Sequence, residues 1–176
     1  MKVYQTDEIK NIALLGNDGA GKTTLTEALL YEAGIIKRRG RITLHNTVSD
    51  YFPVEHEYGY SVFSTVFHTE FNGKKLNIID CPGADDFVGQ ALTALNVTDT
   101  AILLLNGQYG PEVGTQNHFR YTEKLHKPVI FLVNQLDSEK CDYNMVVERL
   151  VENYGSKVVQ VQYPLNEGPN FNSLID

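Results

Sequence analysis

An eight-residue run near the amino terminus constrains the fold of this chain more than any other feature. Residues 16–23 read Gly-Asn-Asp-Gly-Ala-Gly-Lys-Thr, which matches the pattern G-x-x-x-x-G-K-T of a phosphate-binding loop. The run follows an apolar segment at residues 12–15 and precedes a stretch of helical character at residues 22–31. Because the motif requires this strand-loop-helix context, the sequence predicts a phosphate site here.

The residue types of this loop suit a polyphosphate ligand. Glycines let successive backbone N–H groups turn inward around an anion, at the positive end of the following helix. Lys22 supplies a charge for the outer phosphates, and the Thr23 hydroxyl can ligate Mg²⁺. The expected nucleotide-binding residues of the loop are Asn17, Asp18, Gly19, Ala20, Gly21, Lys22, Thr23 and Thr24. The alternative reading is a glycine-rich turn without a ligand.

Composition narrows the classes of protein to which the chain can belong. With 176 residues, 42% of them hydrophobic, the chain is long enough for one well-cored domain and short for two. Its net charge of −7 disfavours autonomous nucleic-acid binding, because a phosphate backbone would be repelled over most of the surface. Its apolar runs are far shorter than the ~20 residues of a membrane-spanning helix. The chain has two cysteines, which lack the spacing of metal ligands, and this favours a location in the reducing cytoplasm.

Short β-branched runs alternate with stretches of helical periodicity along the chain. The pattern predicts strands at residues 11–15, 76–79, 101–105, 129–133 and 158–161, and helices at residues 22–31, 86–95, 115–126 and 144–154. This order is typical of an α/β fold with a mostly parallel sheet and helices on both faces.

Two segments depart from this alternation. Asn72-Gly73, between residues 60–71 and 74–79, predicts a hairpin and therefore one antiparallel edge strand. Residues 34–59 show no sustained periodicity. A connection of this length inside a compact domain is typical of a functional or disordered segment.

A second candidate site element follows the predicted strand at residues 76–79. Asp80-Cys81-Pro82-Gly83 stands at the carboxyl end of that strand, where open α/β sheets bind their ligands. The Asp80 carboxylate can hold a water of Mg²⁺, and Gly83 can offer its backbone N–H to a terminal phosphate. The pattern D-x-x-G also occurs in ordinary turns. Its position after a phosphate loop and a hairpin is what favours a functional site.

A third element follows the predicted strand at residues 129–133. Asn134-Gln135-Leu136-Asp137 is close to the N-K-x-D signature that reads guanine, with Gln135 in place of the lysine. The Asp137 carboxylate can accept hydrogen bonds from the ring N–H and the amine of guanine, whereas adenine would leave it unpaired. We therefore expect Asn134, Gln135 and Asp137 to bind guanine; the alternative is an Asn/Asp turn after a strand.

In this order, the three elements resemble those of a translational GTPase. Residues 37–41 (KRRGR), 46–51 (NTVSDY), 86–89 (DFVG) and 159–165 (VQVQYPL) are similar to elongation factor G, particularly its divergent second subgroup. The resemblance covers nearly the whole chain. It implies a P-loop NTPase G domain that binds GTP or GDP with Mg²⁺, hydrolyses GTP and, in its full-length parent, acts with the ribosome in translocation.

The resemblance also implies roles for single residues and a domain boundary. It assigns Lys22 and Gly83 to catalysis, and Thr23, Ser61 and Asp80 to the metal. In the family, a last base-binding loop and further domains follow the segment that ends here. We therefore expect residues 1–176 to be one G domain that is truncated before that loop.

Two departures from the family pattern bear on hydrolysis. The family's water-orienting histidine aligns with Ala84, and the loss of such a group typically lowers a rate by about 10² to 10⁴. The family's R-G-I-T-I stretch aligns with residues 58–62, where Ser61 keeps a hydroxyl for the metal. We therefore expect attenuated hydrolysis. The open alternatives are a non-hydrolytic GTP-sensing module that contacts the ribosome, a ribosomal protection-type GTPase, and a P-loop kinase of a small substrate.

Overall fold

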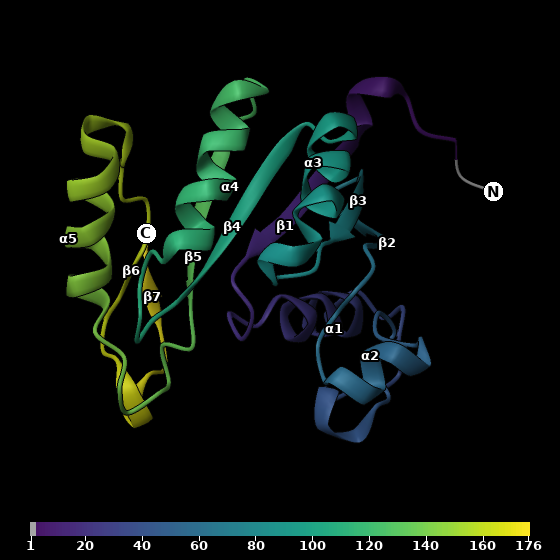
Figure 1. The fold of residues 1–176 in the computed structure, drawn as a ribbon, viewed down its shortest axis with the longest axis horizontal. Coiled ribbons are helices and arrows are strands. Elements are labelled where there is room, and N and C mark those ends of the chain that lie inside the picture. The colour runs from purple at the N-terminus through teal and green to yellow at the C-terminus, as the bar shows by residue number, and fades with distance from the viewer. Residues whose placement is uncertain (1–2) are drawn as a thin grey trace.

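A central β-sheet organises residues 3–176, which are the residues described by the computed structural model. Within this range the sheet has five strands in the order β2-β3-β1-β4-β5 (Figure 1). They are β1 Ile9–Gly16, β2 Thr65–Phe71, β3 Lys74–Asp80, β4 Thr100–Asn106 and β5 Val129–Asn134. β2 pairs antiparallel with β3, and the other pairs are parallel. The predicted α/β fold with one antiparallel edge strand is confirmed.

Helices cover both faces of this sheet, as the sequence predicted. They are α1 Lys22–Glu32, α2 Pro53–Tyr58, α3 Val88–Val97, α4 Val113–Lys124 and α5 Tyr143–Tyr154. Short 3₁₀ turns (η1 Thr6–Glu8, η2 Ile42–Leu44, η3 Asp85–Phe87, η4 Gly155–Lys157, η5 Gly168–Asn170) and a small hairpin (β6 Tyr163–Pro164, β7 Leu174–Ile175) complete the chain. Among residues 3–176, every helix is too short or too polar to cross a membrane.

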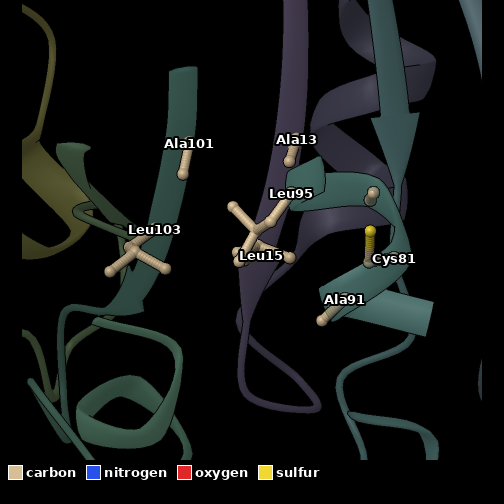
Figure 2. Close-up of a cluster of buried hydrophobic side chains, with 8 residues drawn as sticks. Ala13, Leu15, Cys81, Ala91, Leu95, Ala101 and Leu103 are labelled. Carbon is tan, nitrogen blue, oxygen red and sulfur yellow. The ribbon is translucent and has the colours of Figure 1, made fainter. Parts of the chain in front are cut away.

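The alternation of side chains along β1 decides which helix packs on which face. Ala13 and Leu15 are fully buried in a cluster with Ala91 and Leu95 of α3 (Figure 2). Leu14 belongs to a separate cluster, against which Leu25 of α1 packs. Because successive side chains of a strand point to opposite faces, one strand anchors helices on both sides.

The register of the parallel strands brings their carboxyl ends to the same edge of the sheet. Leu14 of β1 lies opposite Asp80 of β3, and Asn106 of β4 lies opposite Asn134 of β5. The loops that follow β1, β3 and β5 therefore meet at one edge. These are the loops that carry the three sequence elements described above.

The predicted strand at residues 158–161 is wrong. In the described chain these residues pair with no strand, and the side chains of Val159 and Val161 are 77% and 78% exposed. β-branched residues favour a strand only where a neighbouring strand can complete the backbone hydrogen bonds.

The strand predicted for residues 60–71 begins only at Thr65. Upstream of it, side chains take the backbone amides that a strand would have paired. Glu55 accepts the N–H groups of Val62 and Phe63, and Gln90 accepts that of Ser64. The connection at residues 34–59 contains η2 and α2, and a helix of six residues gives too few repeats for periodicity to show.

Candidate nucleotide-binding site

The predicted phosphate loop forms a tight turn between β1 and α1. Gly16, Gly19 and Gly21 have φ angles of 142°, 73° and 95°, a region that favours glycine. A Cβ on Gly21 would lie 2.4 Å from Asn134 Nδ2, and a Cβ on Gly16 would lie 2.4 Å from the carbonyl oxygen of Leu104. The loop therefore needs glycine at both positions for conformation and for space.

Lys22 folds back over this loop. Its Nζ donates to the carbonyl oxygens of Gly16 and Asn17 at 2.9 and 3.0 Å. The side chain is buried, and burial lowers the pKa of its ammonium group, an effect that the charge of Asp80 opposes. The ammonium group is thus placed among the backbone groups of the loop, where an anion would be held.

Hydroxyl and carboxylate oxygens from three segments converge beside Lys22. Thr23 Oγ1 donates to Asp80 Oδ2 at 3.2 Å and lies 3.4 Å from Ser61 Oγ. Ser61 Oγ in turn donates to Asp50 Oδ1 at 2.7 Å. Asp80 Oδ1 and the neighbouring Thr26 hydroxyl are buried without a well-aligned hydrogen bond to any described residue. A set of hard oxygens that includes a buried, unsatisfied carboxylate oxygen fits Mg²⁺.

Two carboxylates dominate the electrostatics of this cluster. Burial raises the pKa of Asp80 from 3.8 to about 7, although the charge of Lys22 opposes the shift. Burial also raises the pKa of Asp50, and its charge adds to the shift at Asp80. A cation bound between these groups would favour their charged forms, because it supplies the opposite charge.

The loop after β3 passes close to the phosphate loop at Gly83. A Cβ on Gly83 would lie 2.5 Å from Lys22 Nζ and 2.6 Å from the backbone nitrogen of Asp18. Only glycine permits this approach. The next residue, Ala84, is partly buried and brings no polar side-chain atom to the position.

These residues enclose a cavity of about 230 Å³. It is lined by Asp18, Gly19, Gly21, Lys22, Thr23, Ile42, Asp50, Gly59, Tyr60, Ser61 and Gly83. The connection at residues 34–61 therefore forms one wall of the cavity. Thr24, which the sequence placed in the site, is exposed in the first turn of α1 and lies outside the described lining.

The predicted base-reading residues are tied to the phosphate loop. Asn134 Nδ2 donates to the carbonyl oxygen of Ala20 at 2.9 Å, and Gln135 Nε2 donates to that of Gly19 at 2.8 Å. Gln135 has a φ of 59° and also accepts a hydrogen bond from Asn106. Asp137 is exposed to solvent next to them. The structure thus joins the second and third sequence elements to the first, and the proposed roles of these residues stay predictions.

Asp18 uses one of the amides that the loop motif offers to a ligand. Its Oδ1 accepts the N–H of Gly19 at 2.9 Å, and the side chain is exposed at the rim of the cavity. The sequence alone does not indicate the direction of this side chain. A carboxylate in this place competes with a phosphate both for the amide and by charge repulsion.

Sequence reasoning missed three acidic residues that shape the site. Asp50 belongs to the oxygen cluster. The sequence feature that could have revealed it was an acidic residue between the phosphate loop and the D-x-x-G element. Glu27 and Glu55 are buried and accept backbone N–H groups of the cavity wall. For Glu27 the signal was a charged residue on the same helical face as Thr23 and Leu30.

Comparison with known proteins places this site in a family. The family model described as the elongation factor Tu GTP binding domain matches residues 7–170. The chain belongs to this family. Membership of this family confirms the predicted P-loop G-domain fold. It also excludes the small-substrate kinase, an alternative that the sequence had left open.

Relatives within the family place the G domain among elongation-factor-G-like proteins. The chain is 33% identical over 168 residues to an elongation factor G-like protein of Thermotoga maritima, covering 96% of the chain and 24% of that protein. It is 39% identical over 155 residues to tetracycline resistance protein TetP of Clostridium perfringens, covering 88% and 24%. A crystal structure of a Thermus thermophilus protein has a TM-score of 0.90 and 37% identity, covering 96% of the chain and 25% of that protein. The chain spans about a quarter of the length of these relatives.

Proposed function

We propose that this chain is the GTP- and GDP-binding domain of a cytoplasmic, elongation-factor-G-like protein that acts in ribosomal translocation. The observation that carries the proposal is that the phosphate loop and Ser61 line one cavity, with Asp80 accepting a hydrogen bond from Thr23 and Asn134 tied to the same loop. Relatives named elongation factor G and elongation factor G-like protein support the link to translation. The ribosome is the expected partner of the whole protein, and the acidic net charge argues against autonomous nucleic-acid binding.

Each part of the site has a proposed task. Lys22 and the loop amides hold the phosphates, and the N–H of Gly83 contacts the terminal phosphate. Thr23, Ser61 and Asp80 hold Mg²⁺, which would neutralise phosphate charge in the bound state. Because Asp50 accepts a hydrogen bond from the Ser61 hydroxyl, the lone pairs of that hydroxyl stay free for the metal.

The base-reading assignment is tested by titrating labelled GTP and ATP with and without magnesium. We expect GTP to bind at least about tenfold more tightly than ATP, because adenine leaves the Asp137 carboxylate unpaired. Asp137→Ala is expected to remove most of this preference, whereas Glu139→Ala, an exposed neighbour, keeps it. Equal affinity of the native chain for the two nucleotides would contradict the assignment.

We also propose that intrinsic hydrolysis is slow, because Ala84 presents no side-chain group to orient water. Single-turnover measurements on native chain and Ala84→His test this. The variant is expected to be faster by up to about 10² to 10⁴. Fast turnover by the native chain, unchanged in Ala84→His, would refute it.

A second candidate function is supported by Ala84 and by the relative named tetracycline resistance protein. This candidate has two forms. In the first, bound GTP only sets the conformation that a ribosomal partner recognises. In the second, the whole protein protects ribosomes from a drug. Ribosome-stimulated GTP turnover by the whole protein would count against a non-hydrolytic module. If the whole protein restored peptide synthesis by ribosomes in the presence of tetracycline, this result would support protection. If it did not, translocation would be favoured.

A further inference from the structure

Two buried glutamates hold the wall of the cavity without belonging to the cavity lining. Glu27 of α1 is 1% exposed and Glu55 of α2 is 2% exposed. Neither is among the described residues that line the cavity. Both accept hydrogen bonds from backbone N–H groups of residues 40–63, the segment that brings Asp50 and Ser61 to the oxygen cluster.

Glu27 fastens the first half of this segment to α1. Its Oε2 accepts the N–H of Gly40 at 2.6 Å, and its Oε1 accepts the N–H of Val48 at 2.6 Å. Hydrogen bonds from amides to an ionised carboxylate are short and strong. Since α1 also begins with Lys22 and Thr23, this carboxylate ties the segment to the helix that follows the phosphate loop.

Glu55 closes the second half of the segment into a loop. Its Oε1 accepts the N–H groups of Val62 and Phe63 at 3.0 and 3.1 Å, and its Oε2 accepts that of Phe52 at 3.2 Å. One side chain therefore fixes both ends of residues 52–63. Ser61 immediately precedes the first of these anchored amides.

The anchored amides bracket the residues that face the metal site. Asp50 lies two residues after Val48 and two residues before Phe52, and Ser61 adjoins Val62. The two carboxylates thus hold Asp50 and Ser61 through the backbone on either side, beside the direct contacts that His56 and Thr47 make with the backbone of Asp50. A weaker tether would release these two oxygens from Thr23 and Asp80 without altering the phosphate loop itself.

We propose that Glu27 and Glu55 are positioning residues that couple magnesium to nucleotide retention. They do so by holding Asp50 and Ser61 at the oxygen cluster. The inference rests on the proposed nucleotide site. Glutamine at either position preserves volume but turns one acceptor into an NH₂ group facing a backbone N–H, so at least one tether is lost, and the remaining neutral oxygen accepts hydrogen bonds more weakly than a carboxylate does.

The test compares GTP affinity in magnesium and in EDTA for native chain, Glu27→Gln and Glu55→Gln. In magnesium, each variant is expected to bind GTP about tenfold more weakly than native chain. In EDTA, each is expected to bind as native chain does. The matched control is Glu57→Gln on α2, at an exposed position, and it should equal native chain in both buffers.

Amide hydrogen exchange supplies a readout that is independent of affinity. Exchange at Gly40 and Val48 should accelerate in Glu27→Gln, and exchange at Val62 and Phe63 should accelerate in Glu55→Gln. The amides of β1 should keep their native rates.

The possible failures can be told apart. A variant that loses its helical signal, or that loses affinity equally in both buffers, would show that the carboxylate supports the fold as a whole and would overturn the inference. Variants with native affinity in magnesium would also overturn it. If native chain binds no GTP in either buffer, the proposed function itself fails, and the inference fails with it.

Discussion

Ser61 Oγ donates a hydrogen bond of 2.7 Å to Asp50 Oδ1. The two residues lie at opposite ends of a loop that carries α2, and Ser61 in turn lies 3.4 Å from Thr23, which donates to Asp80. One wall of the cavity is therefore a chain segment that has folded onto the phosphate loop through polar contacts. The stability of that wall should respond to charge and pH more than to apolar packing.

Asp80 should make the stability of the ligand-free chain fall as pH rises. Its pKa is about 7 in the folded chain and 3.8 as an ordinary carboxyl, so the folded state binds the proton more tightly. The resulting stabilisation is present at low pH and is lost between about pH 4 and 7, at about 1.4 kcal/mol per pKa unit.

Urea unfolding of native chain and Asp80→Asn at several pH values checks this. The difference in unfolding free energy between the two should change by a few kcal/mol between pH 4 and 8, in the direction that favours the variant at high pH. Asp7→Asn, at an exposed position, should give a curve parallel to that of native chain. Parallel curves for Asp80→Asn would contradict the prediction.

His118 should act in the opposite direction on the acid side. It is buried in α4 with Nδ1 unpartnered among the described residues, and burial lowers its pKa from 6.5 to about 4. Because the unfolded chain binds this proton more tightly, the stabilisation is present above pH 6.5 and is lost as pH falls towards 4. His118→Phe should reduce the fall in unfolding free energy between pH 6.5 and pH 4, measured by urea unfolding. His68→Phe, on the exposed side of β2, should leave this fall unchanged.

Substitution of Gly83 should weaken both nucleotide binding and the fold. In Gly83→Ala the new methyl group collides with Lys22 Nζ and the backbone of Asp18, and such overpacking costs about 1–3 kcal/mol. We expect GTP affinity to fall about tenfold or more in calorimetric titrations. In Gly89→Ala the methyl group meets no described atom within 4 Å, so affinity should hold and stability should rise by up to about 1 kcal/mol.

Removal of the Asp18 carboxylate should strengthen nucleotide binding. In Asp18→Ala the Gly19 amide is released for a phosphate and one repulsive charge is lost. We expect GTP affinity to rise several-fold at low ionic strength. The gain should shrink at 1 M salt, where the Debye length is about 3 Å. Unchanged affinity at low salt would show that this side chain turns away from the bound ligand.

The parts of the fold that the sequence predicts correctly, and the predicted site residues that the structure brings together, are those with local signals. The phosphate loop, Asp80 and Asn134 each stand directly after an apolar strand, and parallel strands bring such positions to one edge. The Asn72-Gly73 turn likewise marks its hairpin without reference to any distant residue.

The parts that the sequence does not predict depend on distant partners. Glu27 bonds to Gly40 and Val48 across an aperiodic segment, and nothing in the spacing of these residues indicates the contacts. Residues 158–161 show the converse, because their β-branched composition favours a strand but the described chain offers them no pairing neighbour. Thr24 follows the loop pattern and is exposed outside the described lining of the cavity, so its place in the site stays a prediction.

The strand register described above also sets a distance. Each residue of a strand advances the chain by about 3.3 Å, so a slip of one residue between β4 and β5 would move Asn134 by more than the length of a hydrogen bond. The span between the phosphate cradle and the base-reading loop is therefore fixed by the sheet rather than by flexible loops. If the two loops bind phosphates and base as proposed, a bare polyphosphate or a free nucleoside would reach only one end of that span, and the spacing of the backbone would favour whole nucleotides.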